Sequence, residues 1–286
     1  MDIKLKRWSQ LGLGAALATG TLTACGGDPA EPIADQEIVA EVPIAASGVE
    51  TQVGGGEGGP GGEGEGGEGE GGVSIAAAAT DPIVYQSALA ITEAHIIAAR
   101  DAFSEGEKNA AAEMFAHPVS EVLADMAPVF EARGVADFNT LLTQASAAVF
   151  DGEDDSQINA RADEIIAALR AASEKAPDDG SSPATIAAGV AADQIERATD
   201  MYRVAAESDR YEPYLDGYGF YKAAEAAFLT AEAQIDTEDV ESANTIREAL
   251  MLLNEAYPTA LRPDALDADQ SALTVASSRV ILAVEN

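Results

Sequence analysis

Apolar residues recur at intervals of three and four from about residue 76 to the end of the 286-residue chain. This spacing puts apolar side chains on one face of an α-helix, whereas a half-buried strand needs strict alternation. The segment is rich in alanine, and no stretch of it alternates for the length of a useful strand. We therefore expect residues 76–286 to form one all-α domain, a single bundle of about 7–9 helices that can bury its own core.

Capping residues and turn residues set the expected helix boundaries. Asp81 followed by Pro82 is typical of an N-cap and the first helical position, and Gly106 marks a tight turn after the first long helix. Pro118 and Pro128 are expected to bend the second helical stretch. The helices are predicted over residues 81–103, 107–133, 137–150, 156–175, 183–207, 214–234, 237–257 and 267–284.

A segment of different composition precedes the bundle. Residues 25–75 are poor in aromatic side chains, and residues 54–72 consist largely of glycine and glutamate. Such a sequence cannot bury a core, and its repeated charges repel one another. We expect a disordered, extended tether that holds the helical domain away from its point of attachment.

The first 25 residues resemble the start of a bacterial lipoprotein. Three basic residues fall within the first seven, a short apolar run covers residues 11–18, and Leu-Thr-Ala-Cys ends at Cys25. The resemblance to a lipobox implies that residues 1–24 are a signal peptide and that the Cys25 thiol carries lipid. Residue 26 is Gly rather than Asp, which favours an outer membrane position facing the periplasm or the cell surface.

Charge and cysteine content narrow the classes of function. The net charge is -34, so the chain repels phosphate backbones and nucleic acid is excluded as a partner. Cys25 is the single cysteine, so neither an intramolecular disulfide nor a cysteine-based metal cage can form. The partners expected are the membrane, through lipid at Cys25, and other envelope proteins. The acidity itself is interpreted as an aid to solubility beside a membrane or in salt, ahead of a specific cationic partner.

The two histidines lie at equal distances along the chain from the turn at Gly106. If the flanking helices pack antiparallel, His95 and His117 sit level with each other. Glu121 follows His117 at i+4 and Asp125 at i+8, so one helix face could carry a histidine and two carboxylates. These four residues are the candidate metal ligands.

Two interpretations of the histidines stand. Imidazole with carboxylate suits iron, zinc or copper better than calcium, and haem held by histidine is a lesser alternative. In the other interpretation, His95 is a buried, hydrogen-bonded core residue among apolar neighbours, and Pro118 disturbs the helical register that the i+4 spacing of Glu121 requires.

Tyrosines gather in one short segment of a chain that is otherwise poor in aromatic residues. The interpretation favoured is a helix junction in which the tyrosine hydroxyls cap neighbouring backbone groups. The alternative is a second binding patch formed by Tyr211, Tyr214, Asp216 and Tyr218. Two glycines, Gly217 and Gly219, lower the helix propensity of this segment, so close packing or a ligand is expected to compensate.

No enzymatic motif is recognisable. The sequence has no HExxH helix and no phosphate-binding glycine-rich loop, and both histidines lie on one predicted hairpin, which disfavours a Ser-His-Asp arrangement. We expect a protein without catalytic activity, and peptidase activity in particular is not expected.

Several helical segments are similar to the imelysin-like domain found in EfeO-type iron-uptake proteins. The segments that carry this resemblance, in the same order as in the family, are residues 105–115, 126–134, 208–220 and 246–257. The GxHxxE motif of that family is absent, because Tyr221 stands where its histidine would be in the nearest approach, which begins at Gly219.

The resemblance implies a helical bundle attached to the envelope and linked to iron acquisition. Together with the residues above, it predicts a lipoprotein that binds a metal such as iron, or haem, as an accessory of iron uptake. The alternative is a non-catalytic scaffold or protein-interaction lipoprotein that carries no ligand.

Overall fold

The computed structural model describes residues 72–285, and all regular elements in that part are helices, as the apolar spacing predicts. The signal peptide of residues 1–24, the lipid attachment at Cys25 and nearly all of the tether lie outside the described residues and stay predictions. The helices are α1 (Ile75–Ala78), α2 (Pro82–Ser104), α3 (Lys108–Pro118), the π-helix η1 (Val119–Leu123), α4 (Ala124–Arg133), α5 (Asn139–Ala148), α6 (Asp155–Ser173), α7 (Pro183–Ala206), α8 (Glu212–Glu238), α9 (Val240–Ala256) and α10 (Gln270–Val284).

Local capping chemistry explains where the long helices begin. The carboxylate of Asp81 accepts hydrogen bonds from the backbone N–H groups of Ile83 and Val84 and so caps α2, with Pro82 at its first position. At the end of α2, Gly106 takes a φ of 91°, a backbone conformation open to glycine, and the chain turns into α3. These are the features on which the first predicted hairpin depends.

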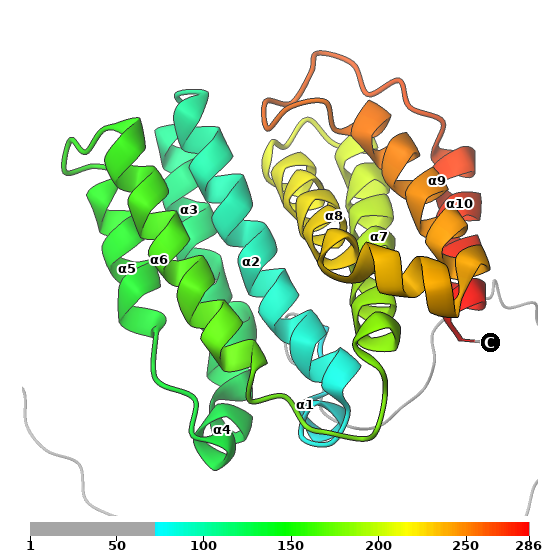
Figure 1. The fold of residues 1–286 in the computed structure, drawn as a ribbon. Coiled ribbons are helices and arrows are strands. Elements are labelled where there is room, and N and C mark those ends of the chain that lie inside the picture. The colour runs from blue at the N-terminus through cyan, green and yellow to red at the C-terminus, as the bar shows by residue number, and fades with distance from the viewer. Residues whose placement is uncertain (1–71, 286) are drawn as a thin grey trace, which may run out of the picture. The chain divides into compact units, whose positions relative to one another are not determined.

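The helices form two groups that share one central helix (Figure 1). In one group, α3 and α6 pack on α2 and α5 lies against both of them; in the other, α7 packs on α8, α9 and α10. The groups meet because α2 also packs on α7 and α8. All residues from 87 to 99 in α2 are buried, which is the pattern of a helix enclosed on every side.

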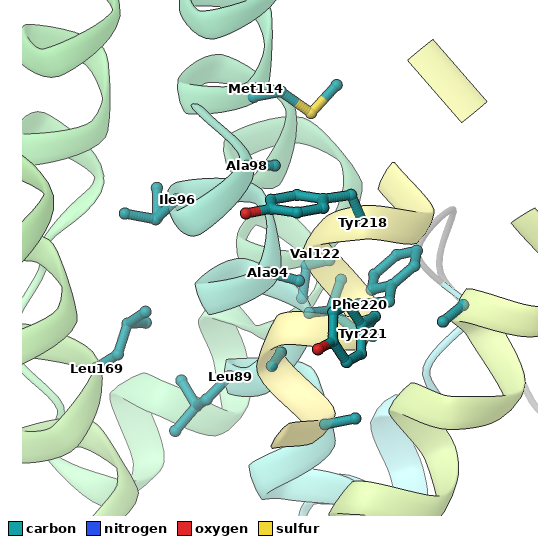
Figure 2. Close-up of a cluster of buried hydrophobic side chains, with 14 of the residues drawn as sticks. Leu89, Ala94, Ile96, Ala98, Met114, Val122, Leu169, Tyr218, Phe220 and Tyr221 are labelled. Carbon is teal, nitrogen blue, oxygen red and sulfur yellow. The ribbon is translucent and has the colours of Figure 1, made fainter. Parts of the chain in front are cut away.

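Glycine lets α8 approach α2 closely. A Cβ atom on Gly219 would lie 2.5 Å from the Ala94 carbonyl oxygen, and one on Gly217 would lie 1.9 Å from the Tyr257 hydroxyl oxygen. Figure 2 shows Tyr218 extending from α8 toward Ala98 of α2 in the same region. Close packing is therefore the compensation for the low helix propensity of this segment.

The two prolines of the second helical stretch behave differently. After Pro118 the helix widens into η1, where the Ala124 N–H bonds to the Val119 carbonyl five residues back. Pro118 has no N–H to donate and its ring crowds the preceding turn, which favours such a rearrangement. Pro128, in contrast, lies within α4, which continues through it, so the second predicted bend does not interrupt the helix.

The described fold begins slightly before the predicted start of the bundle. Val73 is buried in the core, the Gly72 carbonyl accepts a hydrogen bond from Arg197, and Ser74 caps α1. Residues 72–75 therefore belong to the packed part rather than to the tether. In residues 72–285 the structure has no helix with both the length and the apolar character that crossing a bilayer requires.

Candidate metal centre

The first two members of the site come from the α2–α3 hairpin. His95 is on α2 and His117 is near the end of α3, and their ring centroids are 6.0 Å apart at an interplanar angle of 72°. The hairpin therefore brings the two imidazoles together as their equal spacing from Gly106 predicts. His95 is enclosed, with 5% of its side chain exposed, whereas 24% of His117 is exposed.

The third member comes from α8. One ligand atom from each of His95, His117 and Asp216 lies within 4.8 Å of the other two, the only such cluster of potential metal ligands among the described residues. The sequence predicts Asp216 in the tyrosine patch and not beside the histidines. Its place beside the histidines depends on the long-range approach of α8 to α2, where Gly219 lies against the Ala94 carbonyl. No local sequence pattern predicts that approach.

The hydrogen bond of His95 selects its tautomer. Nδ1 lies 2.8 Å from the Ile91 carbonyl oxygen, and because a carbonyl only accepts, Nδ1 carries the proton. Burial lowers the pKa of His95, against the opposite effects of the Ile91 hydrogen bond and the Glu121 charge. The neutral ring therefore turns an unprotonated Nε2 toward the cluster, the arrangement found in metal-bound histidines.

Two carboxylates face that nitrogen. Nε2 of His95 lies 3.6 Å from Glu121 Oε2 and 3.7 Å from Asp216 Oδ1. Asp216 Oδ1 is buried and has no hydrogen-bond partner. Burial raises the pKa of Asp216 to about 7, although the charge of His117 lowers it. Three acceptor atoms thus converge with no donor from the described side chains, an arrangement that a cation, a proton or a bridging water molecule relieves.

The spacing of these atoms is close to that of a coordination shell. Metal–ligand bonds of about 2.0–2.2 Å place neighbouring ligand atoms about 3.3–3.6 Å apart in a tetrahedral site. The distances from His95 Nε2 are 3.6 and 3.7 Å, and no pair in the three-residue cluster exceeds 4.8 Å. Small side-chain movements would bring the three ligands onto one ion.

Glu121 joins the site through the π-helix. Its Oε1 lies 3.9 Å from His117 Nδ1 while its Oε2 faces His95, so this carboxylate spans both rings. The i+4 relation to His117 is kept across Pro118 and into η1. π-helical turns often occur at functional sites, since they reposition a side chain within a helix.

Asp125, the fourth predicted ligand, is not part of the cluster. It lies in the first turn of α4, beyond η1, and forms no ion pair with either histidine within the described part of the chain. The i+8 position lies about two turns, roughly 12 Å, from His117 along the helix axis. The structure therefore leaves Asp125 outside the three-residue cluster.

The hydroxyl groups of Tyr211, Tyr214 and Tyr218 form hydrogen bonds within the protein. Tyr211 donates to the Ala260 carbonyl and Tyr214 to the Thr259 carbonyl, each at 2.8 Å, and Tyr218 donates to Asp101 at the same distance. Burial raises the pKa of all three hydroxyls. Two of these hydroxyls bond to backbone carbonyls, as the helix-junction interpretation expects, whereas Tyr218 bonds to a side chain. Of the residues in the predicted binding patch, Asp216 alone joins the histidine cluster.

Comparisons of the chain with protein-family models, with curated proteins and with solved structures gave no match. The function must therefore be inferred from the site. Two imidazoles and one or two carboxylates form a donor set of nitrogen and oxygen that suits iron, zinc or copper.

Proposed function

We propose that this protein binds a transition-metal ion through His95, His117 and Asp216. The observation that supports this proposal is the convergence of the unprotonated His95 Nε2 with Asp216 Oδ1, a buried acceptor that has no partner. A buried acceptor pair of this kind lowers the stability of the metal-free protein, and a divalent ion would satisfy both atoms.

The proposed physiological role is that of a metal-binding accessory in iron uptake, held at the cell envelope by lipid on Cys25. The lipobox supports the anchor, and the similarity of four helical segments to EfeO-type proteins supports the link to iron. Binding without catalysis agrees with the lack of an enzymatic motif in the sequence. Expression that rises on iron starvation would support the iron role, and expression that does not respond would count against it.

The binding proposal is tested with purified protein titrated anaerobically with ferrous iron and separately with zinc, copper and haem. We expect dissociation constants of about micromolar or lower for at least one metal ion. The double substitution of His95→Ala and His117→Ala should abolish that binding and leave the helical circular dichroism unchanged. Asp125→Asn is the matched control, since it removes a nearby carboxylate outside the cluster, and it should bind like the wild type.

Two outcomes would contradict the proposal. Undiminished binding by the double histidine variant would assign the metal to the acidic surface. No binding by the wild-type protein would leave the alternative of an envelope scaffold without a ligand.

A further inference from the structure

The four polar residues of the metal centre differ in their access to solvent. The exposed fraction of the side chain is 5% for His95, 17% for Asp216, 24% for His117 and 37% for Glu121. His95 and Asp216 thus form the inner end of the site, and Glu121 forms its outer end. An ion coming from solvent meets the Glu121 carboxylate before it meets the inner pair.

Glu121 lies beside both histidines but outside the three-residue cluster. Its two oxygens lie 3.6 Å from His95 Nε2 and 3.9 Å from His117 Nδ1, whereas the mutually close atoms belong to His95, His117 and Asp216. Among the described residues, the ion-pair partners of Glu121 are these two histidines alone. No lysine or arginine of residues 72–285 forms an ion pair that would hold this carboxylate away from an arriving cation.

We propose that Glu121 is the entry ligand of this site: it takes a hydrated metal ion from solvent, passes it to His95, His117 and Asp216, and removes it again on release. This inference rests on the proposed metal binding. A carboxylate at the outer end can replace a bound water while the ion keeps the rest of its hydration shell, so the ion exchanges its ligands one at a time.

An entry ligand has a distinctive kinetic effect. Because it stabilises the ion between solvent and the inner ligands, it lowers the same barrier in both directions. Its loss therefore slows association and dissociation together and changes the dissociation constant little. Loss of an ordinary ligand instead acts mainly on the dissociation rate, as most changes in affinity do.

The test is stopped-flow spectroscopy of the full-length mature protein with Co²⁺, whose visible absorption reports coordination. Association is followed on mixing with Co²⁺, and dissociation on mixing the loaded protein with EDTA. For Glu121→Gln we expect both rate constants to fall about tenfold and the dissociation constant to stay within about threefold of the wild type. Glu121→Asp, which keeps the charge on a shorter side chain, should recover part of both rates.

The control is Asp125→Asn, which removes the same charge from the same helical stretch and should leave both rates within about twofold of wild type. Three results would overturn the inference: unchanged rates in Glu121→Gln, an increased dissociation rate with unchanged association, or equal slowing in Asp125→Asn. Failure of the wild type to bind any metal ion is a different result, because it removes the proposed function itself.

Discussion

At the scale of single residues, the notable feature is that a proton and a metal ion compete for the same atoms. His95 is neutral with its Nδ1 proton donated to Ile91, and Asp216 is a buried carboxyl with a pKa of about 7. Metal binding requires that Asp216 lose its proton, so affinity should rise with pH up to about neutrality. Acid would return the proton to Asp216 and, further down, to His95.

The same competition predicts how Asp216 affects the metal-free protein. An unfolded aspartate has a pKa of about 3.9, and the folded value is about 7, so the folded state binds this proton more tightly. The contribution of Asp216 to stability is thus full below pH ~4 and is lost as pH rises through ~7. Asp216→Asn mimics the protonated form and should remove that loss.

Urea denaturation in the presence of EDTA measures the free energy of unfolding of the metal-free wild type and of Asp216→Asn. At pH 8 the Asp216→Asn variant should be more stable than the wild type by about 1–3 kcal/mol, and near pH 4 the two should be equal within error. His95 has a lowered pKa and costs stability in acid, so the comparison at pH 8, where its ring is neutral, is the decisive one. A wild type that is the more stable at pH 8 would contradict the prediction.

At the scale of helices, the approach of α8 to α2 creates the site. Gly219 sits against the Ala94 carbonyl, next in sequence to His95, and Asp216 lies almost one turn earlier on α8. Phe220, which follows Gly219, packs edge-on against the His95 ring with centroids 5.8 Å apart. The distance between the helix axes therefore determines whether Asp216 reaches His95.

Gly219→Ala should destabilise the protein by about 1–3 kcal/mol, because its Cβ would meet backbone at 2.5 Å and α8 would have to move away. Metal affinity should fall as Asp216 moves with it. Gly189→Ala is the matched control, since the nearest contacts of its Cβ would be with the Ile83 side chain, at 2.8 Å, and not with backbone. A side chain can shift more easily than a helix backbone, so thermal unfolding should show a smaller loss for Gly189→Ala. Equal losses in the two variants would contradict this account.

Features that depend on residues close in sequence could be predicted, whereas features that depend on contacts between distant segments could not. The start of α2, the turn at Gly106 and the level placement of His95 and His117 depend on neighbours in sequence, and all three follow from local rules. Asp216 could not be assigned to the site, because its place depends on α8 packing across the chain.

Two other features of the structure were also beyond prediction from local sequence rules. A π-helical turn follows Pro118, between His117 and Asp125, and spacing rules for a regular helix do not predict it. Gly217 and Gly219 indicated close packing in the sequence, but not the helix against which they pack.

At the scale of the whole molecule, the described residues form a helical domain that carries the candidate metal centre. This domain includes Gly72, the last residue of the glycine- and glutamate-rich tract, whose carbonyl bonds to Arg197. If Cys25 carries lipid as proposed, the residues between Cys25 and Gly72 set how far the site can lie from the membrane.

The anchor is tested in living cells by Cys25→Ser. Wild-type protein should incorporate labelled palmitate and fractionate with membranes, because an acyl-bearing N-terminus partitions into the bilayer. The variant should accumulate as unprocessed or soluble protein, and globomycin should block processing of the wild type. Membrane fractionation of Cys25→Ser with no palmitate on the wild type would contradict the prediction.

The central position of α2 gives the proposed ion a mechanical role. His95, His117 and Asp216 belong to three helices and to both helix groups, so one bound ion would close two loops of the chain, residues 95–117 and 117–216. Cross-links over loops of this size restrict the unfolded ensemble, as disulfides do. If the single cysteine carries lipid as proposed, coordination would be the cross-link left to this chain, and loss of the metal would loosen the junction of the two groups and expose the protein to proteolysis.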